Sequence, residues 1–323
     1  MINKLLDKHF GKKVIAIVGI SKNSGKTTFL NWLVKRNPNI KIAVTTTGRD
    51  GEDFDLLTGH NKPKVALPKN VIFTTFSEII NNQASHVKVL KKIPFQVIGK
   101  DLWLCETLHY TQTEIIGPVT CKEHNELISI FHDYECEIVL IDGSIDRKSI
   151  CLSDKITHVV LVIGASFGNL EEIKKRSKKI YYLSKIPKIN IPDYECITYN
   201  NYSTNLKTIF GNENFINEIL NKKPDWIYIP GSITNSSWNL IKNNFYNNNT
   251  TLIVNHPINI DINTNHLFDI IAKNKIQSRI PFSLEVIAVN SNSPNNEHID
   301  VDVLIKEIEN IFYDIPVIDV TKA

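Results

Sequence analysis

The sequence lacks long apolar runs, closely spaced cysteines and a leader-like N-terminus. No apolar stretch in the 323-residue sequence approaches the roughly 18 to 20 residues that a helix needs to cross a bilayer. Residues 1–13 are interrupted by the polar Asp7-Lys8-His9 and contain no apolar segment of signal-peptide length. The five cysteines are widely spaced without a Cys-x-x-Cys pair, which argues against a disulfide framework and a cysteine zinc site. We therefore predict a cytoplasmic protein with reduced thiols and no membrane partner.

Blocks of like charge and histidine clusters are also missing. The 37 Lys and Arg and the 34 Asp and Glu give a net charge of only +3 and are scattered along the chain. This pattern predicts no nucleic-acid partner. The ten histidines show no metal-ligand spacing such as His-x-x-x-His, so no histidine-bound metal is expected.

What the sequence does contain is a repeated alternation of short apolar runs with helical patterns. Continuous Val/Ile/Leu runs are typical of a parallel sheet that helices cover on both faces. Helical candidates such as residues 170–183 and 301–312 lie between several of them. The sequence therefore predicts one α/β domain over residues 1–323 with a doubly wound, mostly parallel sheet. The runs are residues 14–18, 40–44, 138–141, 159–163, 227–229, 252–254 and 286–289.

Two stretches break this alternation. Residues 95–104 are typical of two strands joined at a Gly99-Lys100-Asp101 turn, so we interpret residues from about 63 to 118 as a β-hairpin elaboration inserted in the sheet. Residues 235–251 are rich in asparagine and are interpreted as a loop that opens with a candidate helix.

The strongest motif follows the first apolar run. Residues 19–27 fit the pattern G-x-x-x-x-G-K-[ST], between a predicted buried strand and a predicted helix that ends before Pro38. Glycines let such a loop turn its N–H groups towards phosphates, and the helix N-terminus adds partial positive charge. A glycine turn with a surface lysine is the structural alternative. The predicted nucleotide-binding residues here are Gly19, Asn23, Ser24, Gly25, Lys26, Thr27 and Thr28.

Within this motif, Lys26 is predicted to bridge the terminal phosphates of ATP and Thr27 to coordinate Mg²⁺. A second Mg²⁺ contact is expected from Asp142, which ends the apolar run 138–141 in the manner of a Walker B acid. The alternative for Asp142 is an acid at an ordinary strand end.

An acidic turn follows the second apolar run, at residues 45–55. Because carboxyl ends of parallel strands converge on the ligand, Asp50 or Glu52 could reach Mg²⁺ or the attacking water. Asp50 is taken as the catalytic candidate beside Lys26 and Asp142, and a solvated acidic turn is the alternative. Arg147 could contact a phosphate or partner, or form a surface ion pair.

The nucleotide base should be recognised late in the chain, at another strand end. Asn290, after residues 286–289, offers an amide donor and acceptor to a purine edge, and Asn255 competes for that role. Both asparagines are also explained as turn residues.

Beyond the loop, residues 159–169 and the turn at Asn290 resemble dethiobiotin synthetase and its relatives. The chain departs from that enzyme after the second strand, where it has Gly-Arg-Asp-Gly-Glu at 48–52. That turn, together with Ile-Asp-Gly-Ser-Ile-Asp-Arg at 141–147, Val-Asn-Ser-Asn-Ser-Pro at 289–294 and Ile-Pro-Val-Ile-Asp-Val at 315–320, resembles the KamB-like subunit of the lysine 5,6-aminomutase reactivase.

The resemblance implies a P-loop ATPase that works with a second ATPase-type subunit. Together they would restore an adenosylcobalamin-dependent aminomutase whose cofactor is damaged, with ATP and Mg²⁺ driving its release. A ligase or kinase like dethiobiotin synthetase and a nucleotide-binding module with little turnover are the alternative functions.

Overall fold

The computed structural model describes residues 11–21, 23–50, 64–144, 153–165, 168–290 and 299–321. We predicted a single domain, whereas the chain folds into two compact units. The first unit contains residues 1–174 and 284–323, and the second contains residues 175–283. The units are described separately below. Among the described residues, no helix is both long and apolar enough to cross a membrane.

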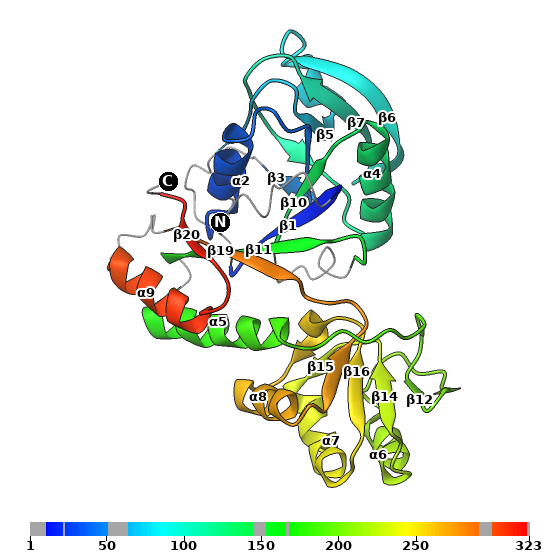
Figure 1. Cartoon of the computed structure of the whole chain (residues 1–323). Helices are drawn as coiled ribbons and strands as arrows, with labels where there is room; N and C mark the ends of the chain where they lie inside the picture. Colours follow the sequence, from blue (N-terminus) through cyan, green and yellow to red (C-terminus); the bar gives the residue numbers. More distant parts are fainter. Residues whose placement is uncertain are drawn as a thin grey trace. The chain divides into compact units, whose positions relative to one another are not determined.

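A nine-stranded sheet forms the centre of the first unit (Figure 1). The strands from β20 to β5 are mutually parallel, and β7 and β6 continue the sheet antiparallel. This confirms a mixed α/β fold with a large, mostly parallel sheet. In spatial order the strands are β20 (Val317–Asp319), β19 (Leu284–Asn290), β11 (His158–Gly164), β1 (Lys13–Gly19), β10 (Ile138–Ser144), β2 (Ile42–Thr46), β5 (Ile72–Phe76), β7 (Lys100–Thr107) and β6 (Val87–Val97).

Apart from the edge strand β20, whose residues are half-buried, the parallel strands are buried on both faces. One face packs against α2 (Lys26–Lys35) through its buried stripe of Phe29, Leu30, Leu33 and Val34. Figure 1 shows α2 and α4 (Cys121–Asp133) on opposite sides of β1 and β10. Burial on both faces is the reason that these strands are continuous rather than alternating apolar runs.

The inserted region forms the expected hairpin, with longer strands and a different turn. Strands β6 and β7 meet at Ile98 and Gly99, both with positive φ, rather than at Gly99-Lys100-Asp101. Two consecutive residues with positive φ are typical of the tight hairpin turn whose twist matches that of the strands. The region also contains α3 (Ser77–Asn81) and β4 (Val65–Leu67), which pairs with β8 (Thr111–Thr113). Its last strand, β9 (Ile115–Ile116), pairs with β3 (Arg49–Asp50), which precedes the region along the chain.

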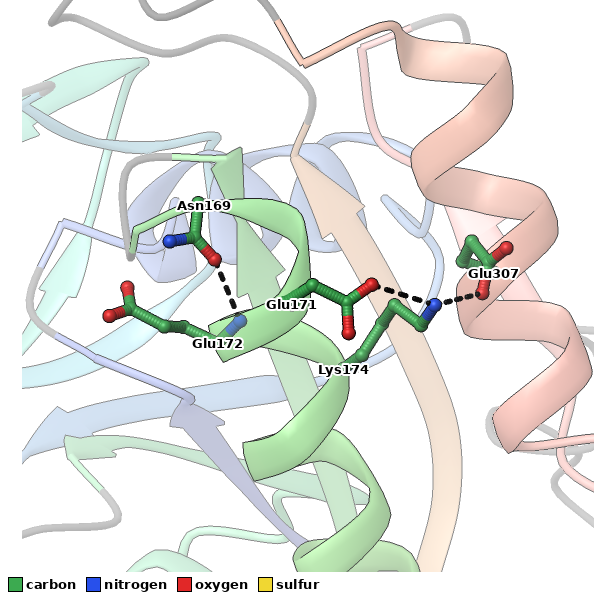
Figure 2. A network of polar contacts seen from close by, with 5 residues as sticks. All are labelled: Asn169, Glu171, Glu172, Lys174 and Glu307. Atoms are coloured by element: carbon green, nitrogen blue, oxygen red, sulfur yellow. Dashed lines mark hydrogen bonds and ion pairs between the residues drawn. The ribbon is translucent and has the colours of Figure 1, made fainter.

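A polar network joins the first turns of one helix to the middle of another (Figure 2). The amide oxygen of Asn169 accepts a 3.0 Å hydrogen bond from the Glu172 N–H at the beginning of α5 (Leu170–Ser184). Lys174 Nζ lies 3.0 Å from Glu171 and 3.1 Å from Glu307 of α9 (Val301–Ile311), and these two acceptors raise the pKa of Lys174. The network connects α5 with α9, the helices that follow β11 and β19 along the chain.

The second unit has its own sheet and core. Its strands β14, β16 and β18 are parallel, and a short hairpin of β12 and β13 extends them. The apolar runs at 227–229 and 252–254 therefore belong to a separate sheet from those at 159–163 and 286–289. The elements are β12 (Thr198–Tyr199), β13 (Tyr202–Ser203), α6 (Glu213–Asn221), β14 (Trp226–Ile229), β15 (Ile233–Thr234), α7 (Asn235–Asn247), β16 (Thr251–Val254), η4 (Pro257–Asn259), β17 (Ile260–Asp261), α8 (Thr264–Ala272) and β18 (Ile276–Ser278).

The asparagine-rich stretch is mostly helix rather than loop. Helix α7 spans Asn235–Asn247 and buries Trp238, Ile241 and Phe245. These positions are three and four residues apart, so they form one apolar stripe that packs into the core. Tertiary burial of this stripe outweighs the low helix propensity of the asparagines.

The N-terminus of α7 provides a first prediction. Thr234 Oγ1 accepts from the Ser237 N–H, and Ser237 Oγ accepts from the Thr234 N–H, forming a capping box. We expect Thr234→Ala to lower the free energy of unfolding by about 1 kcal/mol, the usual value of a lost N-cap. Urea unfolding measures this change, with Thr234→Ser as the matched control that keeps the hydroxyl acceptor. Equal stability of Thr234→Ala and wild type would contradict the assignment of this cap.

Candidate functional site

The two-residue period of the strands brings several predicted site residues to one face of the main sheet. Ile138 and Leu140 of β10 pack in the core beneath α2, so Asp142, two residues further on, lies on the same face. By the same period Asn290 of β19 follows Val286 and Ala288 onto this face. Both lie at the carboxyl ends of parallel strands, the edge where open α/β sheets place ligands.

Lys26 and Asp142 lie together at this edge. Lys26 is the first residue of α2, and its Nζ is 4.0 Å from Asp142 Oδ1. The Asp142 residue is 2% exposed and the Lys26 side chain 17% exposed. A carboxylate is rarely buried to this degree unless a cation is near it, because burial removes its hydration. Lys26, predicted to bridge the phosphates, and Asp142, predicted to contact Mg²⁺, therefore share one partly enclosed site.

The segment 19–28, called here the Gly19 loop, passes directly over the end of β11. A Cβ atom placed on Gly164, the last residue of β11, would lie 2.7 Å from Ser24 Cα and 2.8 Å from the Ser24 carbonyl oxygen. Backbone atoms this close could not move aside for a Cβ atom, whereas the end of a flexible side chain could. Gly164 thus permits the close approach of the loop to the sheet, and the sequence alone indicated it only as part of the run 159–169.

The other close approach in the Gly19 loop is between Gly25 and Asn290. Gly25 is the N-cap of α2 and has a φ of 93°, a conformation that glycine adopts without strain. A Cβ there would collide with the Asn290 carboxamide. Asn290 is 7% exposed, so it is placed against the loop rather than on an open turn. Asn255, the competing candidate for base recognition, lies in the second unit and accepts a 2.8 Å hydrogen bond from Arg279 Nε.

Several polar groups of the Gly19 loop are available to a ligand. Ser24 Oγ is buried and has no hydrogen-bond partner among the described residues. The hydroxyls of Thr27 and Thr28 form no hydrogen bond with any residue that the structure describes, and none of the described side chains caps the N-terminus of α2. The first turn of α2 contains no acidic residue. An N-terminus without a cap or an acid presents N–H groups and partial positive charge, which suits an anion.

The end of β2 and the residue after it are tied to Asp142 by threonines that the sequence did not single out. Thr46 Oγ1 donates a 3.1 Å hydrogen bond to the Asp142 carbonyl oxygen, and the Thr47 N–H donates to the same oxygen at 2.9 Å. The two-residue period of β2 could have indicated Thr46, because it follows the buried Ile42 and Val44 on one face. Thr47 Oγ1 lies 3.5 Å from Nε2 of buried His124, whose pKa is lowered by burial to about 4.

This segment leads to the acidic turn, which the structure describes only in part. Asp50 ends β3, where its backbone is paired with Ile115 of β9. Its carboxylate, Glu52 and Arg147 lie outside the described side chains, so their predicted roles stay predictions.

The oxygen donors of the site are those that Mg²⁺ prefers. The Thr27 hydroxyl and the Asp142 carboxylate are hard oxygen ligands, and Mg²⁺ is commonly held by one or two carboxylates together with substrate phosphates. Across the described part of the chain, no group of three or more His, Cys, Asp or Glu side chains could hold a metal ion. Beyond the Thr27 hydroxyl and the Asp142 carboxylate, further Mg²⁺ ligands would come from a bound phosphate, from water or from the acidic turn at residues 45–55.

Comparisons with protein-family models, with curated proteins and with solved structures found no match to this chain. The chemistry of the site therefore rests on its own residues and their geometry.

Proposed function

We propose that the chain is a P-loop ATPase that binds Mg-ATP at the Gly19 loop. The observation that carries this proposal is the 4.0 Å approach of Lys26 to Asp142 at the carboxyl edge of the parallel sheet. The alternative, a glycine turn with a surface lysine, does not explain why the lysine lies beside a buried acid from a strand distant in the sequence. The pairing of this lysine with this acid supports the Walker A and Walker B assignment.

Each residue has a definite task in this proposal. Backbone N–H groups of the Gly19 loop and of the start of α2 would surround the phosphates, and Lys26 would turn from Asp142 towards the terminal phosphates. Thr27 and Asp142 would hold Mg²⁺, which neutralises phosphate charge when it is bound. Asp50 or Glu52 would orient the attacking water, and the Asn290 amide would face the nucleotide.

A subunit of a reactivating factor is the role that the sequence resemblance supports. In this role the chain works with a second ATPase-type subunit on an adenosylcobalamin-dependent lysine 5,6-aminomutase. A damaged cofactor that is tightly held leaves only if another conformation of the enzyme is favoured, and nucleotide binding and hydrolysis can supply the required difference in free energy.

Recovery of an inactivated aminomutase tests this role. We expect the full chain, its second subunit and Mg-ATP to restore activity to aminomutase that has been inactivated during turnover, and Lys26→Ala to restore none. The matched control is Lys35→Ala, which removes the same charge from the last turn of α2 and should restore activity like wild type. Absence of recovery with wild type would contradict the reactivase role, and an ADP-coupled small-molecule product would instead support the ligase or kinase alternative.

A further inference from the structure

The second unit contains a cavity of about 440 Å³ on one face of its own sheet. In register, Trp226 of β14 is beside Thr251 of β16, and Ile253 of β16 is beside Gln277 of β18. Residues in register on neighbouring strands, and residues two apart on one strand, share a face. Trp226, Thr251 and Gln277 therefore form part of a common floor, and all three line the cavity.

The segment 187–194 forms a wall of this cavity and is held in place at several points. The Ile189 N–H donates to the Ser278 carbonyl oxygen at 2.8 Å, and the Ser278 N–H donates to the Pro187 carbonyl oxygen at 2.9 Å. Further along, Arg279 Nη2 lies 3.2 Å from Asp193 Oδ1. These contacts fix the segment to β18 before it reaches Tyr194, so the wall is built by the fold.

Tyr194 of the wall and Trp226 of the floor form an aromatic pair in the cavity. Their ring centroids are 6.1 Å apart with an interplanar angle of 27°, a stacked arrangement. Both residues line the cavity and are half-buried. A further planar ring can stack on an outer face of such a pair.

A tight hairpin brings polar groups to the same cavity. Asn200 and Asn201 connect β12 and β13 with φ values of 42° and 70°, as asparagine readily does in two-residue hairpin turns. Asn200 Oδ1 accepts from the Asp225 N–H at 3.0 Å, which ties the hairpin turn to the residue before β14. Asn201, Asp225, Thr251 and Gln277 line the cavity, and their side chains form no hydrogen bond or ion pair with any residue that the structure describes.

Asp225 is the only charged side chain among the described residues that line the cavity. An ionised carboxylate accepts hydrogen bonds through two oxygens and donates none. It therefore favours a ligand edge with two parallel N–H donors and disfavours an anionic group. The volume lies within the usual range for small-molecule sites, about 300 to 1,000 Å³.

From these features we infer that the second unit binds a planar heterocycle with a 2-amino-4-oxo-pyrimidine edge, the chemistry shared by guanine and pterin rings. The ring stacks on an outer face of the Tyr194–Trp226 pair, and the carboxylate of Asp225 accepts from the ring N–H and the exocyclic amino group. Asn201 and Gln277 supply amide donors for the oxo group. This site lies within the second unit and does not depend on the proposed ATPase function.

Calorimetric titration of the full chain with guanosine, with pterin and with adenosine tests this site. We expect guanosine or pterin to bind and adenosine to bind at least tenfold more weakly, because adenine lacks the paired donors. The tighter of the first two identifies the source of the ring. Asp225→Asn should lose at least tenfold in affinity. Glu218→Gln, which removes an exposed carboxylate elsewhere in the same unit, should bind like wild type.

Three results would overturn the inference. They are no binding of either ring, equal binding of adenosine, or an Asp225→Asn variant that keeps wild-type affinity together with wild-type thermal stability. Lys26→Ala is expected to keep guanosine binding, since its substitution lies in the first unit. Asp225→Asn, which lies in the second unit, should keep wild-type affinity for Mg-ATP, and this result separates failure of this site from failure of the nucleotide site.

Discussion

Replacing Lys26 with alanine is expected to lower the affinity for Mg-ATP at least 100-fold, about 2.7 kcal/mol of binding free energy. Lys26 begins α2, and its ammonium group lies beside the buried carboxylate of Asp142 near the end of β10. In the proposed complex this charge moves to the terminal phosphates, where hydrogen bonds to charged groups are among the strongest in proteins. Calorimetric titration with Mg-ATP measures the loss directly.

Thermal unfolding gives an independent reading of the same substitution. A ligand present at 100 times its Kd stabilises the folded state by about 2.7 kcal/mol, so wild type should unfold at a higher temperature with Mg-ATP than without it. Lys26→Ala should lose this shift, and Lys35→Ala at the other end of α2 should keep it. A Lys26→Ala variant that binds Mg-ATP like wild type would contradict the assignment of the Gly19 loop.

Replacing Asp142 with asparagine is expected to remove the contribution of Mg²⁺ to nucleotide affinity and to slow ATP hydrolysis at least tenfold. Asparagine has nearly the shape of aspartate, so the packing of this 2% exposed residue between β1 and β2 should survive. A neutral amide is a much poorer Mg²⁺ ligand than a carboxylate. The variant should therefore bind ATP equally in Mg²⁺ and in EDTA, whereas wild type should prefer Mg²⁺.

Without nucleotide, Asp142→Asn should be at least as stable as wild type, although it binds Mg-ATP less well. A buried carboxylate costs desolvation free energy, and active-site groups of this kind commonly reduce stability in return for function. We expect Asp142→Asn to unfold in urea at a denaturant concentration equal to or above that of wild type. Asp133→Asn, an exposed change at the end of α4, is the matched control and should affect neither property. Strong destabilisation, or an unchanged preference for Mg²⁺, would contradict the role of Asp142.

The strand, loop and helix around residues 13–35 could be predicted from the sequence because their signals are local. A continuous apolar run preceded the glycines, and an apolar stripe ended before Pro38. The same holds for Asp142, since the run at 138–141 placed it at a strand end and the two-residue period determined its face. Only the meeting of Lys26 with Asp142 required the order of the strands, which local patterns do not contain.

The division into two units could not be predicted for a physical reason. The runs at 252–254 and 286–289 are equally apolar, and both form parallel strands with buried side chains. A continuous apolar run predicts that a strand is covered on both faces. It does not predict which sheet the strand joins, because strand pairing depends on residues that are distant in the sequence. Helix α7 shows the complementary effect, where buried Trp238 and Phe245 outweighed a composition typical of loops.

Hydrogen exchange of the full chain with and without Mg-ATP reports on the backbone N–H groups that are proposed to hold the phosphates. We expect slower exchange in residues 19–28 and at the start of α2 when Mg-ATP is added, and no such change in Lys26→Ala. Unchanged exchange across the Gly19 loop at saturating Mg-ATP would contradict the assignment of the phosphate site.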